Sequence, residues 1–455
     1  PYTTLFRSRG HEVAWLTGRR HHEKVRAVGA RFIPYAATRD WDDSRMDQEF
    51  PRLAQLAGLA QIKEGVKRAF LDPIPDQVKD LRALLATFPA DVLVCDPCFY
   101  GAPIIGELAG FPVAFLSVIP LPLKGADLPP YGLGLAPMAG FLGRLRNRFL
   151  QLLVDKIAMH DVNGHYDAMR AQVGLAKGPW GAFGYSPQLR FRFMQPSVPS
   201  FEYASSTIPP EVRFIGPILP QAPKDFRLPA WWDGMLTKGA PVVHVTQGTV
   251  AHDYRKLLLP ALEALDGMQA QVIATTGAKP PEALGLATLP ANVRVERFIP
   301  YKVLLPHVDV MVTNGGYGGT TQALAHGVPL VSAGTTEDKM EVNRRVAWSG
   351  VGIDLRTDWP KPAAIREAVG RVIAEPSFRR RAEAIRDEMR QYDAPRLAAA
   401  VFVDAGNVGS EIQAFGFDQM GYGLGTGIRW LLPIGPVRFD AEFAGLSFDA
   451  RDRKS

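Results

Sequence analysis

The chain has 455 residues, of which 47% are hydrophobic and 22% charged, which is the composition of a globular protein of about two or three domains. Its formal net charge of +6 suits an anionic ligand, but the basic residues are spread along the chain, so we expect no nucleic-acid partner. The two cysteines exclude a disulfide scaffold and favour a reducing, cytoplasmic location. Because prolines, glycines and charges interrupt the most apolar stretch, residues 91–123, we expect no membrane-spanning helix in residues 9–395.

The two tips of the chain are unlike the rest. Residues 1–8, PYTTLFRS, are what a common sequencing-adapter sequence encodes, and DRKS at 452–455 is what the start of the matching reverse adapter encodes. We interpret both as adapter-like scars and exclude them from the fold prediction; chance recurrence of short peptides is the alternative. The protein's own sequence would then begin near Arg9, in mid-protein.

Between the tips, short β-rich runs alternate with segments of helical period. The first run is HEVAWLT (11–17), and others lie at 91–96, 112–118, 212–217, 242–248, 270–278, 293–300, 308–316 and 328–334. Such alternation predicts parallel sheets with crossover helices, and the runs form two sets. The proline-rich stretch around 220–238 lies between the sets and is predicted to be a linker; a helix with an apolar stripe is predicted over 363–391.

One glycine-rich turn in the second set has the features of a phosphate site. In TNGGYGGTTQALAHGVP (313–329), an apolar run leads through four glycines into a helical pattern. A helix that begins after such a turn offers unpaired N–H groups and a positive dipole end to an anion. A tight turn without a ligand is one alternative. A nicotinamide dinucleotide site is another, which is weakened because its third required glycine falls on Thr321.

The segment around this turn resembles a known family. RVERFIPYKVLLPHVDVMVTNGGYGGTTQALAHGVPLVSAGTTEDKMEVNRR (294–345) is similar to the nucleotide-sugar signature of family 1, UGT-like glycosyltransferases. RGHEVAWLTG (9–18), FEYASSTIPPEVRFIGPILP (201–220) and VTQGT (245–249) extend the resemblance over about residues 9–395. It implies an α/β protein of the GT-B fold, with two Rossmann-like, doubly wound domains facing across a cleft. The acceptor-binding domain would be 9–219, without its first strand and loop, and the nucleotide-sugar domain 239–395.

The resemblance implies where the donor's base and ribose would bind. Phe298 stands where the family has a tryptophan that stacks on uracil, although a core phenylalanine is an alternative. Ile299 would meet the base edge through its main chain. Gln322 occupies the position of a glutamate that holds the ribose hydroxyls, so hydrogen bonding would survive without the charge.

The diphosphate and the sugar would bind at the glycine turn and just after it. Asn314 replaces a histidine, and Gly318 with Gly319 replace an Asn-Ser pair. The cradle would therefore rely on backbone N–H groups. The predicted cradle comprises Gly315, Gly316, Gly318 and Gly319, with the hydroxyls of Thr249 and Thr320 as further donors.

Two charged residues follow the cradle at the predicted sugar site. Asp338 matches the acidic residue that grips the sugar hydroxyls, whereas Lys339 replaces a glutamine and either selects an unusual sugar or is simply solvated. The resemblance implies no metal and no cofactor beyond the nucleotide-sugar co-substrate.

The family's reaction is a direct displacement that needs a base for the acceptor hydroxyl. The base is a histidine in an N-terminal Gly-His loop, and the aspartate that orients it would be Asp96, at the end of DVLVCD. We expect that histidine to be absent from this chain, and His11 to be structural; His21 and His22 are alternatives only if their helix reaches the cleft. The predicted enzyme is therefore impaired.

Two further segments leave alternatives. Cys95 and Cys98 have the Cys-x-x-Cys spacing of a redox pair, but two half-buried thiols are the favoured interpretation. The proline- and glycine-rich stretch 121–150 is typical of loops that shape a pocket for a small lipophilic acceptor; a packed surface helix with its entry loop is the alternative.

Residues 396–455 differ from the body. YGLGTGIRW (422–430) and VRFDAEFAG (437–445) alternate apolar with polar or small residues, as transmembrane strands do. With FVDAGN (402–407), they resemble the last strands of the outer-membrane barrel-assembly and translocation family. We predict a short antiparallel β tail, joined near 394–400 in an assembly chimera, with a natural fusion as the alternative. So few strands cannot close a barrel, so we expect their edges to stay unpaired or to stick to other surfaces.

Three functions follow from these patterns. The first is an inverting transferase that moves a sugar from a UDP-sugar to a lipophilic alcohol. The second is a nucleotide-sugar-binding protein without turnover. The third, which depends on the tail alone, is an outer-membrane assembly fragment.

Overall fold

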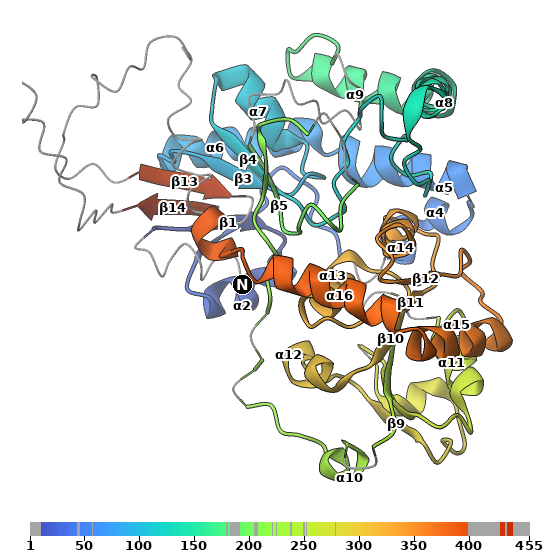
Figure 1. Ribbon diagram of the computed structural model, residues 1–455. Helices are drawn as coiled ribbons and strands as arrows, with labels where there is room; N and C mark the ends of the chain where they lie inside the picture. Colours follow the sequence, from blue (N-terminus) through green and yellow to red (C-terminus); the bar gives the residue numbers. More distant parts are fainter. Residues whose placement is uncertain are drawn as a thin grey trace, which may run out of the picture.

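Two parallel β-sheets, each covered by helices, form the body of the molecule in the computed structural model (Figure 1). The structure describes residues 11–42, 46–56, 58–178, 181–182, 192–203, 208–220, 222–223, 225–236, 239–248, 251, 253–277, 279–398, 428–432 and 435–439. In this part of the chain, no helix combines the length and the apolar character that a membrane crossing requires. The predicted fold, α/β with two Rossmann-like units, is confirmed.

The N-terminal sheet has the strand order β2-β1-β13-β3-β4-β5-β6, with β14 paired to β13. All pairs are parallel except β13 with β14. Its strands are β1 (Ala14–Thr17), β2 (Arg31–Pro34), β3 (Leu93–Cys95), β4 (Val113–Leu116), β5 (Arg192–Gln195), β6 (Val212–Phe214), β13 (Ile428–Leu432) and β14 (Gly435–Phe439).

Helices cover both faces of this sheet because its strands alternate apolar side chains between two cores. Leu93 and Cys95 face a core that includes residues of α6, α7 and α9, whereas Val92 and Val94 face a second core with Val25 of α2. The helices of this half are η1 (Arg19–His21), α2 (His22–Ala27), α3 (Met46–Glu49), α4 (Pro51–Ala54), α5 (Gly58–Gly65), η3 (Val66–Leu71), α6 (Ile74–Thr87), α7 (Gly101–Ala109), α8 (Gly140–Leu153), η4 (Val154–Ala158) and α9 (His160–Gln172).

The C-terminal sheet is entirely parallel, with the order β12-β11-β10-β7-β8-β9. Its central strands are buried on both faces, as β-branched runs between two helical layers should be. The strands are β7 (Val242–Thr246), β8 (Gln271–Thr275), β9 (Val293–Glu296), β10 (Val310–Thr313), β11 (Leu330–Ser332) and β12 (Gly352–Asp354).

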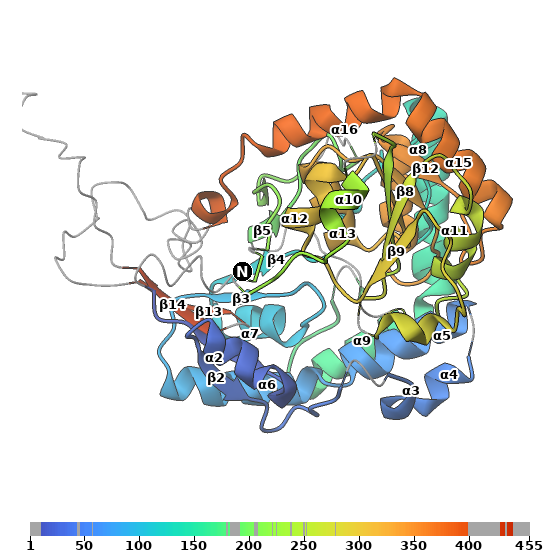
Figure 2. The same ribbon diagram turned by 90° about the horizontal axis from the view of Figure 1, so that it is seen from below.

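The helices of the second half pack on the two faces of this sheet (Figure 2). They are α10 (Trp232–Leu236), α11 (Leu258–Leu265), η5 (Pro281–Leu284), α12 (Tyr301–Leu304), η6 (Leu305–His307), α13 (Tyr317–Ala325), α14 (Lys339–Trp348), α15 (Pro362–Ala374) and α16 (Pro376–Met389). The prediction of one helix over 363–391 is wrong. Pro376 lacks the N–H that would continue the hydrogen-bond ladder, so the segment divides into α15 and α16.

The chain returns to the first sheet after α16, which runs across the molecule in Figure 1. Ala398 is buried in the core of the N-terminal sheet, and Tyr392 lies against Gly216. The predicted linker contains a short helix, α10, whose Trp232 packs edge-on against His307.

The structure decides between the two outcomes predicted for the strand edges of the tail. The antiparallel hairpin is present as β13 and β14, but β13 is not left with unpaired edges. It lies between β1 and β3 and runs parallel to both, with Trp15 opposite Leu432 and Leu93 opposite Leu431. The hairpin therefore belongs to the first sheet.

Candidate functional site

The start of α13 is an uncapped helix N-terminus. Its N-cap, Gly316, has an extended backbone and makes no side-chain capping bond. Gly315 has a φ of +88°, and a Cβ there would lie 1.8 Å from Oδ1 of Asn343, so glycine is required. Gly318 is exposed, and a Cβ there would have nothing within 4 Å. The first N–H groups of α13 are therefore available to an anion.

This helix N-terminus faces the other half of the molecule. Tyr317, the first residue of α13, donates its hydroxyl to Oε1 of Glu202 at 2.8 Å. Gln195, the last residue of β5, donates its amide to the same tyrosine oxygen. Because Glu202 and Gln195 belong to the N-terminal half, α13 begins where the two halves meet.

The polar side chains predicted for the cradle differ in their contacts. Asn314 donates to the carbonyl of Gln247 at 2.7 Å. Thr320 is fully buried, and its hydroxyl has no partner in the part of the chain that the structure describes. The structure therefore places the Thr320 hydroxyl inside the fold, and its contact with the donor stays a prediction. Thr249 lies outside the described residues.

The residues predicted to hold the base and the ribose lie in three different settings. Phe298, just after β9, is 52% exposed, which excludes the alternative of a core phenylalanine, while Ile299 is buried. Gln322 turns back on its own helix and donates to the carbonyl of Gly318 at 3.0 Å. Half-buried Gly319 lies beside Tyr301. An open aromatic face is thus present, whereas the Gln322 amide group is already committed.

Asp338 and Lys339 stand at the start of α14. Burial raises the pKa of Asp338 to about 6, against an opposing effect of Lys339. Lys339 is 8% exposed, and its ammonium group contacts the Glu337 carboxylate and lies 3.3 Å from Oγ1 of Thr336. The alternative of a simply solvated lysine is therefore wrong.

Asp96 follows β3 at the carboxyl edge of the first sheet. Its carboxylate accepts the N–H of Cys98 at 2.7 Å, and burial raises its pKa. Burial, Asp96 and, from the other half, Asp338 all raise the pKa of the Cys98 thiol. The charges of both predicted carboxylates, Asp96 and Asp338, therefore act on the same thiol. Cys95 is buried, and both cysteines are free thiols.

The histidines of the first half do not contact Asp96 in any described hydrogen bond. His11 is buried beside β1. His21 is in η1, where burial and the neighbouring Arg20 and Lys24 lower its pKa, and His22 packs against the ring of Phe32. Among the described residues, the hydrogen-bond partner of the Asp96 carboxylate is Cys98.

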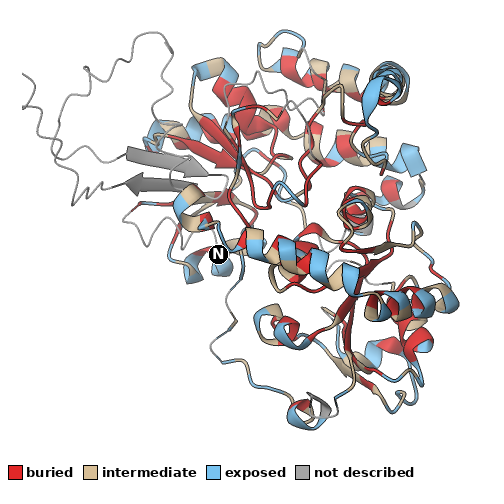
Figure 3. Ribbon diagram, in the orientation of Figure 1, coloured by how far each residue is buried: buried red, intermediate tan, exposed pale blue. Residues whose placement is uncertain are grey.

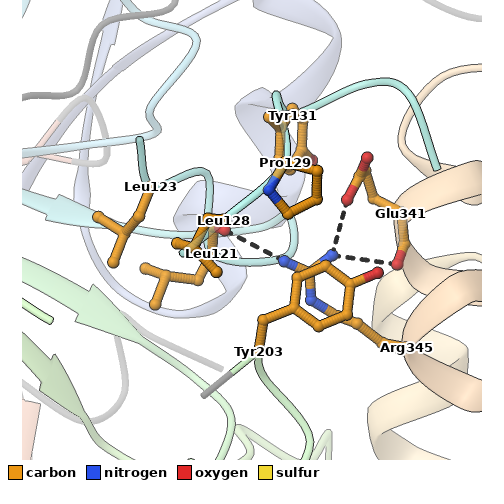
Figure 4. A pocket seen from close by; sticks show the side chains of 8 residues that line it. All are labelled: Leu121, Leu123, Leu128, Pro129, Tyr131, Tyr203, Glu341 and Arg345. Carbon is orange, nitrogen blue, oxygen red and sulfur yellow. Dashed lines mark hydrogen bonds and ion pairs between the residues drawn. The ribbon is translucent and has the colours of Figure 1, made fainter. Parts of the chain in front are cut away.

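A buried charge cluster that the sequence did not reveal joins the two halves; Figure 4 shows its members Arg345, Glu341 and Tyr203. Arg345 of α14 bonds Glu202 at 2.7 Å and Glu341 at 2.9 Å, and all three side chains are almost fully buried. Burial alone would lower the pKa of Arg345, but the two carboxylates outweigh it and raise that pKa. The guanidinium also lies 4.1 Å from the ring centroid of Tyr203. A charged group from the second half is thus held by partners from the first.

The cluster forms the polar wall of a pocket in the predicted acceptor region. The lining residues are Leu121, Leu123, Leu128, Pro129, Tyr131, Tyr203, Glu341 and Arg345. The hydroxyls of Tyr131 and Tyr203 are buried without a partner in the described part of the chain. Glu341 also accepts the N–H groups of Gly132 and Gly134, at 2.9 and 3.0 Å. The predicted acceptor loop is therefore bonded to α14.

Little in the sequence predicted this cluster. Glu341 and Arg345 have the i, i+4 spacing of an ion pair on one helix, but that spacing is common on exposed helices. Their burial depends on Glu202, which lies 143 residues from Arg345. Such a long-range contact leaves no local pattern.

Family models match two parts of the chain. The erythromycin biosynthesis protein CIII-like C-terminal domain matches residues 257–404, and the Omp85 superfamily domain matches residues 384–445. The two matches overlap over residues 384–404, the region that contains the predicted junction.

Two of the relatives align with most of this chain and over most of their own length. 4'-demethylrebeccamycin synthase of Lentzea aerocolonigenes is 49% identical over 387 residues, which are 85% of this chain and 91% of the relative. UDP-glycosyltransferase 2 of Phaeomoniella chlamydospora is 32% identical over 400 residues, 85% of this chain and 88% of the relative.

Solved structures share the fold. The calicheamicin glycosyltransferase CalG4 has a TM-score of 0.63 at 20% identity, covering 90% of this chain and 94% of its own. The glycosyltransferase VinC in complex with DTDP has a TM-score of 0.60 at 21% identity, with 89% and 95% covered.

Proposed function

Because the chain belongs to the family 1 glycosyltransferases, whose GT-B fold it has, we propose that it handles a nucleoside diphosphate sugar, a UDP-sugar in particular. The reaction would move the sugar to a hydroxyl of a small lipophilic acceptor with inversion. The acceptor oxygen forms a bond to the anomeric carbon, the bond to the diphosphate oxygen breaks with its electron pair, and a base takes the hydroxyl proton. We place this reaction in the cytoplasm, in keeping with the two free thiols.

The observation that carries this proposal is the uncapped start of α13, which faces the first half of the molecule. Its N–H groups would hold the diphosphate and stabilise the leaving group, without a metal or cofactor. Phe298 would stack on the base, Ile299 would contact the base edge, Gln322 would reach the ribose after turning outward, and Asp338 would bind the sugar hydroxyls. Asn314, Gly315, Gly316, Gly318, Gly319 and Lys339 complete the proposed donor site.

The test is a charge placed at the helix start. Gly318→Asp introduces a carboxylate where a side chain meets nothing within 4 Å, so the fold should tolerate it. The added charge should favour the helix, yet repel the diphosphate. We expect UDP affinity, measured by calorimetry in EDTA, to fall at least about tenfold, while thermal stability is unchanged or higher.

The matched control is Gly318→Ala, which adds the Cβ without the charge and should retain UDP binding. Equal affinity of Gly318→Asp and Gly318→Ala for UDP would contradict the proposed cradle. Comparing UDP with dTDP in the same titrations would test the preference for uracil, since the solved relative VinC was crystallised with DTDP.

The acceptor is proposed to bind between the 121–134 loop and α14, where the present cavity of about 10 Å³ has room for a water molecule, so the loop would have to open to admit it. The leucines and proline of the pocket suit an apolar molecule, and the two unpartnered hydroxyls, of Tyr131 and Tyr203, suit a polar group on it. Tyr131→Phe should weaken acceptor binding and leave UDP binding unchanged. Equal loss of both ligands would instead indicate a structural role.

We propose that this chain turns over slowly. Asp96 would orient the base, yet its described carboxylate partner is Cys98 rather than a histidine. Binding of a nucleotide sugar without turnover is therefore the second candidate function. We expect UDP to bind while UDP release with mixed alcohol acceptors stays near background, and Asp96→Asn to change that release little. Rapid release that Asp96→Asn abolishes would refute the impairment.

For the tail, we propose an origin in an outer-membrane barrel protein, with a junction near residues 394–400. The support is the match of residues 384–445 to the Omp85 superfamily domain. The test is to amplify the region across the junction from the source DNA. One uninterrupted reading frame through both parts would show a natural fusion and overturn the chimera. An outer-membrane assembly role for the whole chain would require that UDP not bind.

A further inference from the structure

The apolar side of the amphipathic helix α8 faces outward, whereas its buried residues are small or polar. Its buried residues are Gly143 and Asn147, while its bulky apolar side chains face outward. The exposed fractions are 71% for Phe141, 70% for Leu142, 55% for Leu145, 58% for Phe149 and 58% for Leu152. Figure 3 shows this helix largely in the exposed colour at the surface of the N-terminal half.

The inner side of α8 is held by polar contacts that need no apolar packing. Asn147 donates to the carbonyl of Ala126 at 3.1 Å, and Gln151 donates to that of Gly125 at 3.0 Å. A Cβ on Gly143 would lie 1.8 Å from the carbonyl oxygen of Met138, so the helix lies directly on its entry loop. The five outward apolar side chains therefore do not hold the helix in place, and their exposure indicates a binding surface.

The charge on this face narrows the choice of occupant. The helix sequence GFLGRLRNRFLQLL contains three arginines and no acidic residue. Exposed Arg148 makes no ion pair in the part of the chain that the structure describes, and Arg144, 50% exposed, approaches Asp127 only at 3.9 Å. Arg146 donates to the carbonyl of Ala136, so Arg148 is the arginine of this helix whose charge is left without a partner in the described residues. Exposed apolar side chains beside such a cation complement an anionic lipid surface. A second copy of this face would bring like charges together.

The position of α8 connects this surface to the pocket. The loop that Asn147 and Gln151 hold continues through Leu128, Pro129 and Tyr131, which line the pocket. We propose that the outer face of α8 lies in the surface of an anionic phospholipid bilayer, and that the lipophilic acceptor reaches the pocket from that lipid phase. The second part of this proposal rests on the proposed function; the first does not.

The experiment is sedimentation of the full chain with sucrose-loaded vesicles. We expect partition onto vesicles containing phosphatidylglycerol, much weaker partition onto pure phosphatidylcholine, and loss of binding as salt rises. Leu145→Gln with Phe149→Gln should lower the partition coefficient at least about tenfold, and Arg148→Gln about threefold to fivefold, because both apolar burial and charge contribute. Thermal stability should stay unchanged, since these side chains are exposed.

The matched control variants carry the same types of substitution in the C-terminal half. Leu286→Gln with Leu289→Gln removes two leucines, each 43% exposed, from the C-terminal half, and Arg380→Gln removes an exposed arginine of α16. Both should bind vesicles like the parent chain. Parent-like binding by the α8 variants would overturn the proposal and assign binding to another segment, such as the tail.

Two other results would also overturn it. One is equal binding to charged and uncharged vesicles. The other is a dimer in sedimentation equilibrium that the α8 substitutions dissociate, which would make a second copy the occupant. Loss of UDP binding would refute the proposed function while leaving vesicle binding intact, so the two failures are distinguishable.

Discussion

The two sheets differ in the origin of their central strands. In the C-terminal sheet, β7 and β10 lie at the centre, and every strand comes from residues 242–354. In the N-terminal sheet, the position between β1 and β3 is taken by β13, from residues 428–432. The first sheet therefore depends on closing a very long loop, whereas the second is built from consecutive strand-helix units. This difference predicts that the two halves respond unequally when a segment of the chain is removed.

The largest expected effect is that of deleting residues 399–455. Without β13, the facing edges of β1 and β3 lose their shared neighbour, and each buried backbone group left unpaired costs about 1–3 kcal/mol. Hydrogen exchange measured by mass spectrometry should show protection lost in 14–17 and 93–95, but retained in 242–246 and 310–313.

Deleting only residues 440–455 is the matched control, because it leaves β13 and β14 intact. Unchanged protection of the first sheet in the longer deletion would show that β13 is dispensable, and the contrast between the sheets would disappear.

The next effect concerns the contact between the halves. Arg345→Met leaves Glu202 and Glu341 buried without their cation, which should lower the free energy of unfolding by about 3–5 kcal/mol in urea titrations. Arg371→Met, which breaks a half-exposed pair with Glu375, should change it by less than about 1 kcal/mol. Similar losses in the two variants would mean that the buried cluster contributes no special coupling.

A smaller effect tests the glycine turn of the second sheet. In Gly315→Ala, the alanine must adopt the left-handed backbone of Gly315, and its Cβ clashes with Asn343. The substitution should lower the free energy of unfolding by about 1–3 kcal/mol. Gly318→Ala, three residues later in open space, should be neutral or stabilising by up to about 1 kcal/mol. If both substitutions prove neutral by thermal denaturation, the turn is less tightly built than described.

The smallest expected effect is a pH dependence from Asp338. Its folded-state pKa of about 6 lies above the ordinary value of an aspartate, so the folded state binds more protons than the unfolded state between these values. Stability therefore falls as pH rises from about 4 to about 6, by on the order of 1 kcal/mol for this half-buried group.

Urea titrations across this range should show a shallower fall for Asp338→Asn than for the parent. Asp76→Asn, a change on an exposed helical turn, should keep the parental slope. Identical slopes in all three proteins would remove Asp338 as the source.

Much of this architecture was predictable because its strands are short, apolar runs between turn residues. β7 to β11 all lie inside the runs predicted for them, and so do β1, β3, β4 and β6. The strands β2, β5 and β12 were not predicted, since RFIP, RFMQ and GID are too short and mixed to show a period. The place of β13 could not be predicted either, because alternation within a strand does not identify its neighbour.

The candidate site divides in the same way. The glycine turn and the start of α13 have local signals that the sequence displays. The burial of Thr320 and Lys339 and the pairing of Arg345 depend on residues far away in the chain. Sequence reasoning therefore located the glycine turn and the helix start, but not the contacts that join them to the other half.

The buried Arg345 cluster has a mechanical consequence. Its two carboxylates come from opposite halves, so pulling the halves apart would break the Arg345–Glu202 pair while both charges are still in apolar surroundings, before water could solvate them. Resistance to a stretching force should concentrate at this one place. In an optical trap, the halves should therefore rupture in a single abrupt step instead of sliding apart gradually.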